Sequence, residues 1–477
     1  MAKVQNPILF STHFGLEPSA LETAGLIDPF LNVDTQLFID PTLLEKSSNS
    51  IIKDKALPTF RKHFSDFLRL LAISEQEGDA AWRAAQRLLD LSEPGDNGLG
   101  YGGSGRSGSS RPNEIRDKIV RTAKEIITLG SKDPEMLGLM GFFEENVGPD
   151  TISDFTTRVI VDQLSEITEI FCLTNNIPTS DKNKESQFSL PSFDIGGGKK
   201  KYFLLVPSDI VRELPISNDP SEIYAAISFN QKIRDKVNSF LAHPEKTTAA
   251  ERKEAIRRTA LESVDLFNSF LKAIKDYTQP YDQKEDSLGY QKLKEVLQSN
   301  LDSFKIGTKF DFSEGPEKIV ELVHETIGYF KHHVENGNLW EALWENGKPK
   351  RERASQLIYF AIADCFCKAN NIDISPEANM GGGPIDFKFS KGYDARVLVE
   401  IKRSNGTVKH GYEKQLEFYK KAAKTFFGIF VIIDYGDLGN KLLAIEKIRA
   451  DRIESGEIAS AIVVIDATPK KSASKRE

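Results

Sequence analysis

Three ionisable side chains in the C-terminal third of the chain have the types and the spacing of a divalent-cation site. Asp386 and Glu400 each stand between two apolar residues, and Lys402 follows Glu400 by two positions. Burying an unpaired carboxylate is costly, so carboxylates in such surroundings need a cation partner. Two of them together offer the hard oxygen ligands that suit Mg²⁺, while an ammonium beside them can orient a water or stabilise charge on phosphate. The pattern favours metal-assisted attack of water on a phosphate ester.

The segments that carry these residues are predicted to be neighbouring strands. PIDFKFS and RVLVEIKRS are rich in β-branched and aromatic residues. Side chains alternate along a strand, so Glu400 and Lys402 should share one face. An antiparallel hairpin between the two segments can bring Asp386 to Glu400.

The surrounding sequence predicts a helix, three strands, a helix and further strands. A basic, Pro-containing segment at 346–353 marks the start of this region. The predicted elements are a helix over 351–371, strands over 372–378, 384–390 and 396–404, a helix over 409–426, and strands over 427–436 and 461–467.

Three short motifs in this region resemble the PD-(D/E)xK nuclease superfamily. They are GGGPIDF at 381–387, VLVEIKR at 397–403, and QLEFY at 415–419, which is similar to the QxxxY element of RecB-type members. Thirteen residues separate Asp386 from Glu400. The resemblance implies a restriction-endonuclease-like α/β domain with a central mixed sheet.

The same resemblance implies roles for individual residues. Asp386 and Glu400 would hold Mg²⁺ or Mn²⁺, and Lys402 would be the catalytic lysine. Gln415 and Tyr419, one turn apart on a helix, would support the active site. Weaker accessory positions match Glu352 or Gln356 on the first helix, and Glu377 before the glycine turn. The sequence departs from the family pattern at Ile385, which stands between Pro384 and Asp386.

Two alternative interpretations stay open for this cluster. Glu400 and Lys402 could form a structural salt bridge on an exposed strand edge. Alternatively, a nuclease-like fold could bind nucleic acid or a partner without cleaving it. The retention of two carboxylates and a lysine together argues for catalysis, because each of these groups is costly to bury.

Composition is ordinary for a globular protein, but the charge is unevenly distributed. The 477 residues are 39% hydrophobic and 28% charged. From Glu345 to Glu477 there are 23 Lys+Arg and 18 Asp+Glu, a net charge of +5, whereas the first 344 residues have 40 and 52, a net charge of −12. A positive module joined to an acidic one is typical of a protein in which one domain meets phosphate, although ordinary scatter could also produce it. The modest excess predicts weak intrinsic DNA affinity, and hence help from a partner protein or a homo-oligomer.

The chain is long enough for several domains, and we expect an α+β multidomain protein. The predicted domains are a mostly helical N-terminal domain (1–215) with a regulatory, sensing or partner-binding role, a helical middle domain (216–344) and the nuclease-like domain (345–477). Helix-period apolar residues support the first two, notably Phe60, Phe64, Phe67, Leu68 and Leu71. Strand-like LFID (37–40) and KYFLLVP (201–207) are the exceptions.

Other candidate sites are weaker. Glycine dominates residues 95–110, and a triple glycine precedes Lys199, yet neither segment has the ending of a P-loop, so surface loops are expected. His324, His332 and His333 lack an acidic or Cys partner at metal spacing, which favours helix surface or core positions. The three cysteines fit neither a disulfide framework nor a zinc site, and Cys365 and Cys367 are expected to be packing residues.

Together these observations predict a metal-dependent nuclease that hydrolyses DNA in the cytoplasm, with RNA left open. No apolar run of membrane-spanning length occurs, and the N-terminus lacks the apolar stretch of a secretory signal. The N-terminal region, with ISDFTTRVI and LLVPSDIVRELPI, resembles that of prokaryotic proteins that carry this type of nuclease in antiviral defence loci. An effector of antiviral defence is therefore the expected role.

Overall fold

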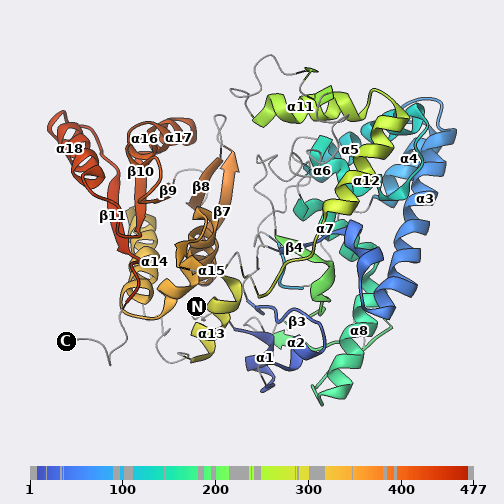
Figure 1. The fold of residues 1–477 in the computed structure, drawn as a ribbon, viewed down its shortest axis with the longest axis horizontal. Coiled ribbons are helices and arrows are strands. Elements are labelled where there is room, and N and C mark those ends of the chain that lie inside the picture. Colours follow the sequence, from blue (N-terminus) through green and yellow to red (C-terminus); the bar gives the residue numbers. More distant parts are fainter. Residues whose placement is uncertain are drawn as a thin grey trace.

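The computed structural model of the chain is a mixed α/β fold, with a largely helical part beside a five-stranded sheet (Figure 1). The structure describes residues 8–17, 19–32, 35, 37–89, 97–100, 111–143, 147, 149–180, 187–194, 200–213, 236–237, 239–240, 249–284, 286, 289–299, 317–345, 347–379, 384–391 and 395–470. Within these residues, no helix combines the length and the apolar character needed to cross a membrane.

The N-terminal and middle parts of the chain are built mainly from helices, as predicted. These are α1 (Phe10–His13), α2 (Ala20–Thr23), α3 (Leu57–Ile73), α4 (Ala80–Leu88), α5 (Arg111–Leu129), α6 (Met140–Phe143), α7 (Pro149–Val159), α8 (Val161–Thr174), α11 (Ala249–Ala260), α12 (Val264–Tyr277), α13 (Tyr290–Ser299) and α14 (Glu317–Glu335). Short helical turns lie between them: η1 (Pro41–Lys46), η2 (Ile52–Ala56), η3 (Pro134–Leu139), η4 (Ser208–Ile210) and η7 (Leu339–Leu343). Short antiparallel strand pairs join β1 (Leu37–Ile39) to β4 (Val211–Glu213), β2 (Ser192–Asp194) to β3 (Lys200–Tyr202) and β5 (Trp344–Glu345) to β6 (Lys348–Pro349).

Helix α3 has the apolar stripe that its sequence predicts. Phe60, Phe64, Phe67, Leu68 and Leu71 are all buried, because residues at these spacings share one face of an α-helix. The stripe packs against α4, α5 and α7. Burial of each such side chain contributes roughly 1.5–3 kcal/mol relative to leaving it exposed.

The sheet is the framework of the C-terminal region. Its strands are β7 (Asp373–Asn379), β8 (Pro384–Lys391), β9 (Ala395–Arg403), β10 (Phe427–Asp434) and β11 (Ala461–Asp466), in the spatial order β11-β10-β9-β8-β7. The strands β7, β8 and β9 pair antiparallel, whereas β10 is parallel to both β9 and β11. The predicted central mixed sheet is thus confirmed.

Helices cover both faces of the sheet (Figure 1). They are α15 (Glu352–Asn370), α16 (Val408–His410), the π-helical turn η8 (Gly411–Gln415), α17 (Leu416–Ala423) and α18 (Lys441–Glu454). In β10, Ile429 and Val431 join the core with α14 and α15, while Phe430 and Ile432 join a second core with α17 and α18. The continuous apolar sequence of β10 reflects burial on both faces.

Helix α18 was not expected from the sequence. Its 14 residues are rich in charged side chains, and within it only Ile445 is fully buried. A helix that packs through so few residues has little apolar periodicity. It provides the crossover that the parallel pair β10–β11 requires.

The strand predicted over 201–207 is shorter than expected. Strand β3 ends at Tyr202, although Phe203 and Leu205 are buried. The reason lies in their backbone amides, because Phe203 N donates to Pro191 O and Leu205 N donates to Thr168 Oγ1. These donors are satisfied outside any ladder, so the chain continues as a buried irregular segment.

The helical part and the sheet share one buried apolar core, which extends from Leu9 to Ala467. Polar contacts accompany it: Tyr290 of α13 donates to Asp28 O, and Lys350, two residues before α15, donates to Asp286 O. Most of the glycine-rich stretch 95–110, the triple glycine 196–198 and the predicted boundary at 215/216 lie outside the described residues.

Candidate active site

Strand β9 presents Glu400 and Lys402 on one face and an apolar row on the other. Val399 and Ile401 are fully buried in the core formed with α14 and α15. Leu398 lies on the opposite face, in the core formed with α17, so Glu400 and Lys402 project toward α17 as the alternation predicts. Glu400 is only 2% exposed. β9 lies between β8 and β10, so the predicted ion pair of Glu400 with Lys402 is present but does not lie on an exposed edge.

Asp386 reaches this cluster because β8 parts from β9 at that residue. The last backbone pair between the two strands is Phe387 with Val399. At the next position, the side chain of Asp386 replaces the backbone as the hydrogen-bond partner of β9: its Oδ2 accepts a hydrogen bond from Ile401 N at 2.6 Å. The other oxygen, Oδ1, accepts from Nε2 of Gln356 on α15 at 2.9 Å. Strand pairing is thereby replaced by a side chain that points at the ExK segment.

Lys402 joins the sheet to the first turn of α15. Its Nζ lies 2.9 Å from Glu400 Oε1 and 2.8 Å from Glu352 Oε1. The second oxygen of Glu352 accepts from Arg403 N at 3.2 Å. Glu352 is the first residue of α15, where a carboxylate also interacts favourably with the helix dipole. The ammonium is therefore held in place between two carboxylates.

Burial and mutual repulsion disturb the titration of the cluster. Burial, followed by the negative charge of Glu400, raises the pKa of Asp386 well above its usual range. Burial also raises the pKa of Glu400, against the opposing effect of Lys402. For Lys402, burial lowers the pKa, but the carboxylates of Asp386, Glu400 and Glu352 outweigh it, so the pKa is raised overall. Strongly shifted pKa values in neighbouring groups are typical of functional sites.

The cluster has the donor chemistry of a divalent-cation site. Three carboxylates, from Glu352, Asp386 and Glu400, face the single ammonium of Lys402, so negative charge is in excess. Oε2 of Glu400 is buried and has no hydrogen-bond partner among the described residues. A buried carboxylate oxygen without a hydrogen-bond donor is available to coordinate a cation. Among the described residues, however, no three Asp, Glu, His or Cys side chains converge as a complete metal-binding group.

Gln415 and Tyr419 lie on the neighbouring helical segment. Tyr419 is 6% exposed, and burial raises its pKa, helped by the negative charge of Glu400. Gln415 has a buried Oε1 with no hydrogen-bond partner in the described part of the chain. Neither side chain hydrogen-bonds to the Asp386–Glu400–Lys402 group in the structure described.

Glu377, the third accessory prediction, lies in β7. It stands between Pro376, which pairs with Phe387, and Ala378, which pairs with Ile385. Its side chain is outside the described residues.

One residue of the site was missed in the sequence. Gly411 lies so close to the cluster that an added Cβ would be 3.1 Å from two ring carbons of Phe430 and 3.3 Å from Cγ of Lys402. A small residue here lets the π-helical turn η8 pack directly on the stem of Lys402. The signal in the sequence was a glycine just inside a predicted helix, where it costs stability unless packing requires it.

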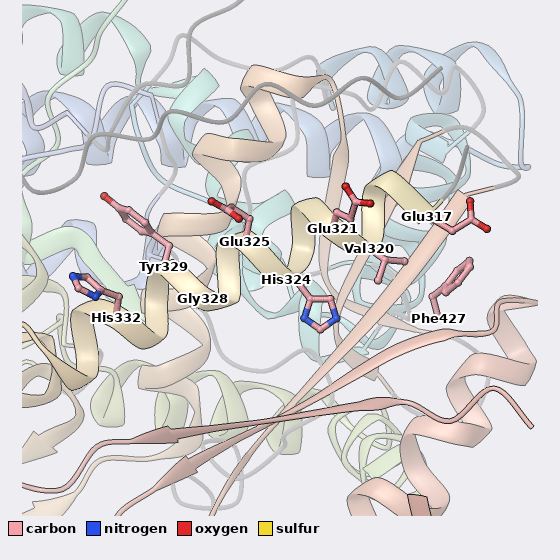
Figure 2. A pocket seen from close by; sticks show the side chains of 9 residues that line it. All are labelled: Glu317, Val320, Glu321, His324, Glu325, Gly328, Tyr329, His332 and Phe427. Atoms are coloured by element: carbon pink, nitrogen blue, oxygen red, sulfur yellow. The ribbon is translucent and has the colours of Figure 1, made fainter. Parts of the chain in front are cut away.

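A groove of about 810 Å³ lies elsewhere, on the outer side of α14 (Figure 2). Its lining residues are Glu317, Val320, Glu321, His324, Glu325, Gly328, Tyr329, His332 and Phe427. Three glutamates make it unsuitable for a phosphate. His324 and His332 are exposed, whereas His333 is buried and burial lowers its pKa to about 4. The prediction of helix surface and core histidines is confirmed. Cys367 is a buried free thiol, as predicted, and Cys172 is another, whereas the side chain of Cys365 lies outside the described residues.

Two family models match the chain, and both describe domains of unknown function. The model for DUF8371 matches residues 319–437, which begin in α14, end just after β10, and contain every residue of the cluster. The model for DUF8370 matches residues 15–218 of the helical part. No curated protein and no solved structure matches the chain.

Proposed function

We propose that the protein is a metal-dependent nuclease that hydrolyses phosphodiester bonds of DNA, with the centre of the reaction at Asp386, Glu400 and Lys402. The observation that carries the proposal is the position of the Lys402 ammonium, which Glu400 and Glu352 hold between them. Asp386 lies beside this group, where β8 separates from β9 and the Asp386 carboxylate accepts a hydrogen bond from Ile401 N. Three buried or half-buried ionisable groups in contact are costly unless they serve chemistry.

Asp386 and Glu400 are the residues that would hold a Mg²⁺ or Mn²⁺ ion. When bound, such an ion supplies Lewis-acid polarisation of a phosphate oxygen and a more acidic water. The unpaired Oε2 of Glu400 and the excess of carboxylates fit this assignment.

The protein residues contribute orientation and charge. Glu352 and Glu400 hold the Lys402 ammonium, whose third N–H group donates to Ile401 O at the longer distance of 3.3 Å. This weak contact can be exchanged for the attacking water or a phosphate oxygen. Gln356 and the amide of Ile401 fix both oxygens of Asp386. A compact ammonium at position 402 suits the ordering of a single water better than a guanidinium would.

The arrangement of elements also supports a restriction-endonuclease-like fold. A helix precedes three antiparallel strands, the middle and last of these bear Asp386 and Glu400, and a helical crossover leads to a parallel strand. This order agrees with the fold implied by the motif resemblance. A role as an antiviral effector rests on the resemblance of the N-terminal region alone and stays a prediction.

The test is cleavage by the purified full chain of supercoiled plasmid, linear duplex, single-stranded DNA and RNA, with Mg²⁺, Mn²⁺ or EDTA. Glu400→Ala and Lys402→Ala should abolish metal-dependent cleavage. Glu135→Gln is the matched control, because Glu135 is a buried carboxylate of the helical part that also pairs with a lysine, Lys275, at 2.5 Å. Cleavage that survives both substitutions would overturn the proposal. Metal-independent binding without cleavage would instead favour a binding protein with a nuclease-like fold.

A further inference from the structure

An exposed strip of basic and aromatic side chains runs along the crossover that follows β9. It consists of Lys414, Phe418, Lys421, Lys424 and Phe426, here called the α17 strip. Lys414, Phe418 and Lys421 are spaced by four and three residues, so they share one face of the helix.

Both aromatic rings of the strip are open to solvent. Phe418 is 49% exposed and Phe426 is 69% exposed, whereas Leu416 and Ala423 in the same segment are fully buried. Exposing a large aromatic side chain forfeits the stabilisation of burial. Both rings therefore leave a large apolar area unburied on this segment.

The charges of the strip are free of acidic partners. In the described part of the chain, no carboxylate forms an ion pair with Lys414, Lys421 or Lys424. Glu417, the acidic residue in the midst of the strip, is itself held by Lys420 at 3.1 Å and by Arg452 at 2.9 Å. The strip therefore presents several ammonium groups to an approaching polyanion.

The strip adjoins the candidate active site. Phe418 neighbours Tyr419, with ring centroids 6.0 Å apart in an edge-to-face arrangement. Tyr419 packs in the same apolar core as Leu398 of β9, two residues before Glu400, so α17 lies against the strand that bears the cluster. Gly411, one turn before Lys414, packs on the stem of Lys402. A ligand lying along the strip would reach the cluster within about one or two helical turns.

We infer that the α17 strip binds a single-stranded DNA segment of the substrate and guides it to the catalytic cluster, an inference that rests on the proposed function. Phe418 and Phe426 act as stacking platforms for unpaired bases, and the lysines contact the phosphates on either side. Stacking on an exposed ring requires a base that is not already stacked in a duplex, which selects single strands. Phosphate contacts from lysine add affinity that does not depend on sequence.

The test measures the binding of a labelled oligo(dT) of about 20 nucleotides to the full chain in EDTA. Fluorescence anisotropy gives the Kd over a range of salt concentrations. Phe418→Ala should raise the Kd about tenfold, Phe418→Trp should leave it near the wild-type value, and Phe418→Leu should resemble alanine, since leucine is apolar but cannot stack. Lys421→Gln should lower the dependence of the logarithm of the Kd on the logarithm of the salt concentration by about one unit or less. Leu443→Ala, an exposed apolar residue of α18, is the matched control and should have no effect.

Each contrary outcome overturns the inference in a recognisable way. Equal losses of duplex and oligo(dT) binding would show general electrostatic binding, and binding only of RNA would exclude a DNA strand. An altered molar mass of Phe418→Ala in light scattering, with unchanged DNA binding, would identify the strip as a contact between copies of the chain. Because binding is measured without metal, it is separable from cleavage: cleavage that depends on Lys402 but not on Phe418 would keep the proposed function and reject the strip.

Discussion

The ammonium of Lys402 lies 2.8 Å from the carboxylate of Glu352, fifty positions earlier in the chain, so the first turn of α15 holds the end of β9. The same carboxylate accepts a hydrogen bond from the backbone amide of Arg403. Glu352 therefore acts as a positioning residue, because its two oxygens bind the consecutive residues Lys402 and Arg403 of the strand.

Glu352→Gln should lower kcat about tenfold or more while KM stays within about twofold, because the neutral amide orients Lys402 less strongly than a charged partner. Steady-state cleavage of a saturating substrate measures both constants. Glu135→Gln, which weakens the equivalent pair with Lys275, should leave kcat unchanged. A rise in KM without a change in kcat would show that Glu352 binds substrate and does not position the lysine.

Substitution of Gln356 should alter the apparent affinity for the metal. Gln356 Nε2 donates to Asp386 Oδ1 at 2.9 Å, and loss of such an outer hydrogen bond weakens metal binding about 10- to 100-fold. Gln356→Glu should be worse than Gln356→Ala, because it places a further carboxylate against Asp386. Titration of cleavage rate against Mn²⁺ concentration measures the effect, and identical curves for wild type and both variants would contradict it.

Without metal, the buried carboxylates should make stability fall as pH rises. Folding raises the pKa of Asp386 above its usual 3.8 and that of Glu400 above its usual 4.5, so the folded chain binds these protons more tightly than the unfolded chain. The stability that these protonated carboxyls contribute is fully present below their usual pKa values. It is lost as the pH rises through their raised pKa values in the folded chain.

Asp386→Asn should remove part of this fall in stability with rising pH, because asparagine does not ionise. In EDTA, the Tm of the variant relative to wild type should therefore increase as pH rises above about 4. Thermal unfolding at a series of pH values measures the difference, in which the titration of unrelated groups cancels. Saturating Mg²⁺ should restore wild-type stability selectively at the higher pH, since a cation binds the ionised carboxylates. A difference in Tm that does not vary with pH would contradict the raised pKa.

Gly411→Ala should impair catalysis through the stem of Lys402. A Cβ at 3.1–3.3 Å from Phe430 and Lys402 is closer than ordinary contact, and the fully buried Phe430 ring has little room to yield. We expect a loss of about 1–3 kcal/mol in the free energy of unfolding and a lower kcat.

Gly328→Ala is the matched control for this substitution. Gly328 is also helical, but nothing lies within 4 Å of the position of an added Cβ. It should gain about 0.4–1 kcal/mol of stability, as glycine-to-alanine changes do where space and backbone allow. Chemical denaturation of both variants decides the matter; equal effects at the two positions would show that the contact with Lys402 has no consequence.

The sequence alone determined those features that depend on short-range periodicity. The two-residue alternation of a strand placed Glu400 and Lys402 on one face, and the 3.6-residue period of a helix predicted the buried stripe of α3. Runs of apolar and β-branched residues predicted the strands, whereas the mixed sheet was implied by the motif resemblance. Helix α18 was not predicted, because a helix that buries little apolar surface has no periodic pattern of apolar residues in its sequence.

The tertiary structure decided which distant groups complete the cluster. The sequence offered Glu352 or Gln356 as alternatives, whereas the fold uses both: Glu352 for Lys402 and Gln356 for Asp386. It also decided that β8 parts from β9 at Asp386 and that Gly411 packs on Lys402. These contacts depend on how helices seat on a sheet across tens of residues. Such packing is a sum over many weak interactions that no local spacing in the sequence encodes.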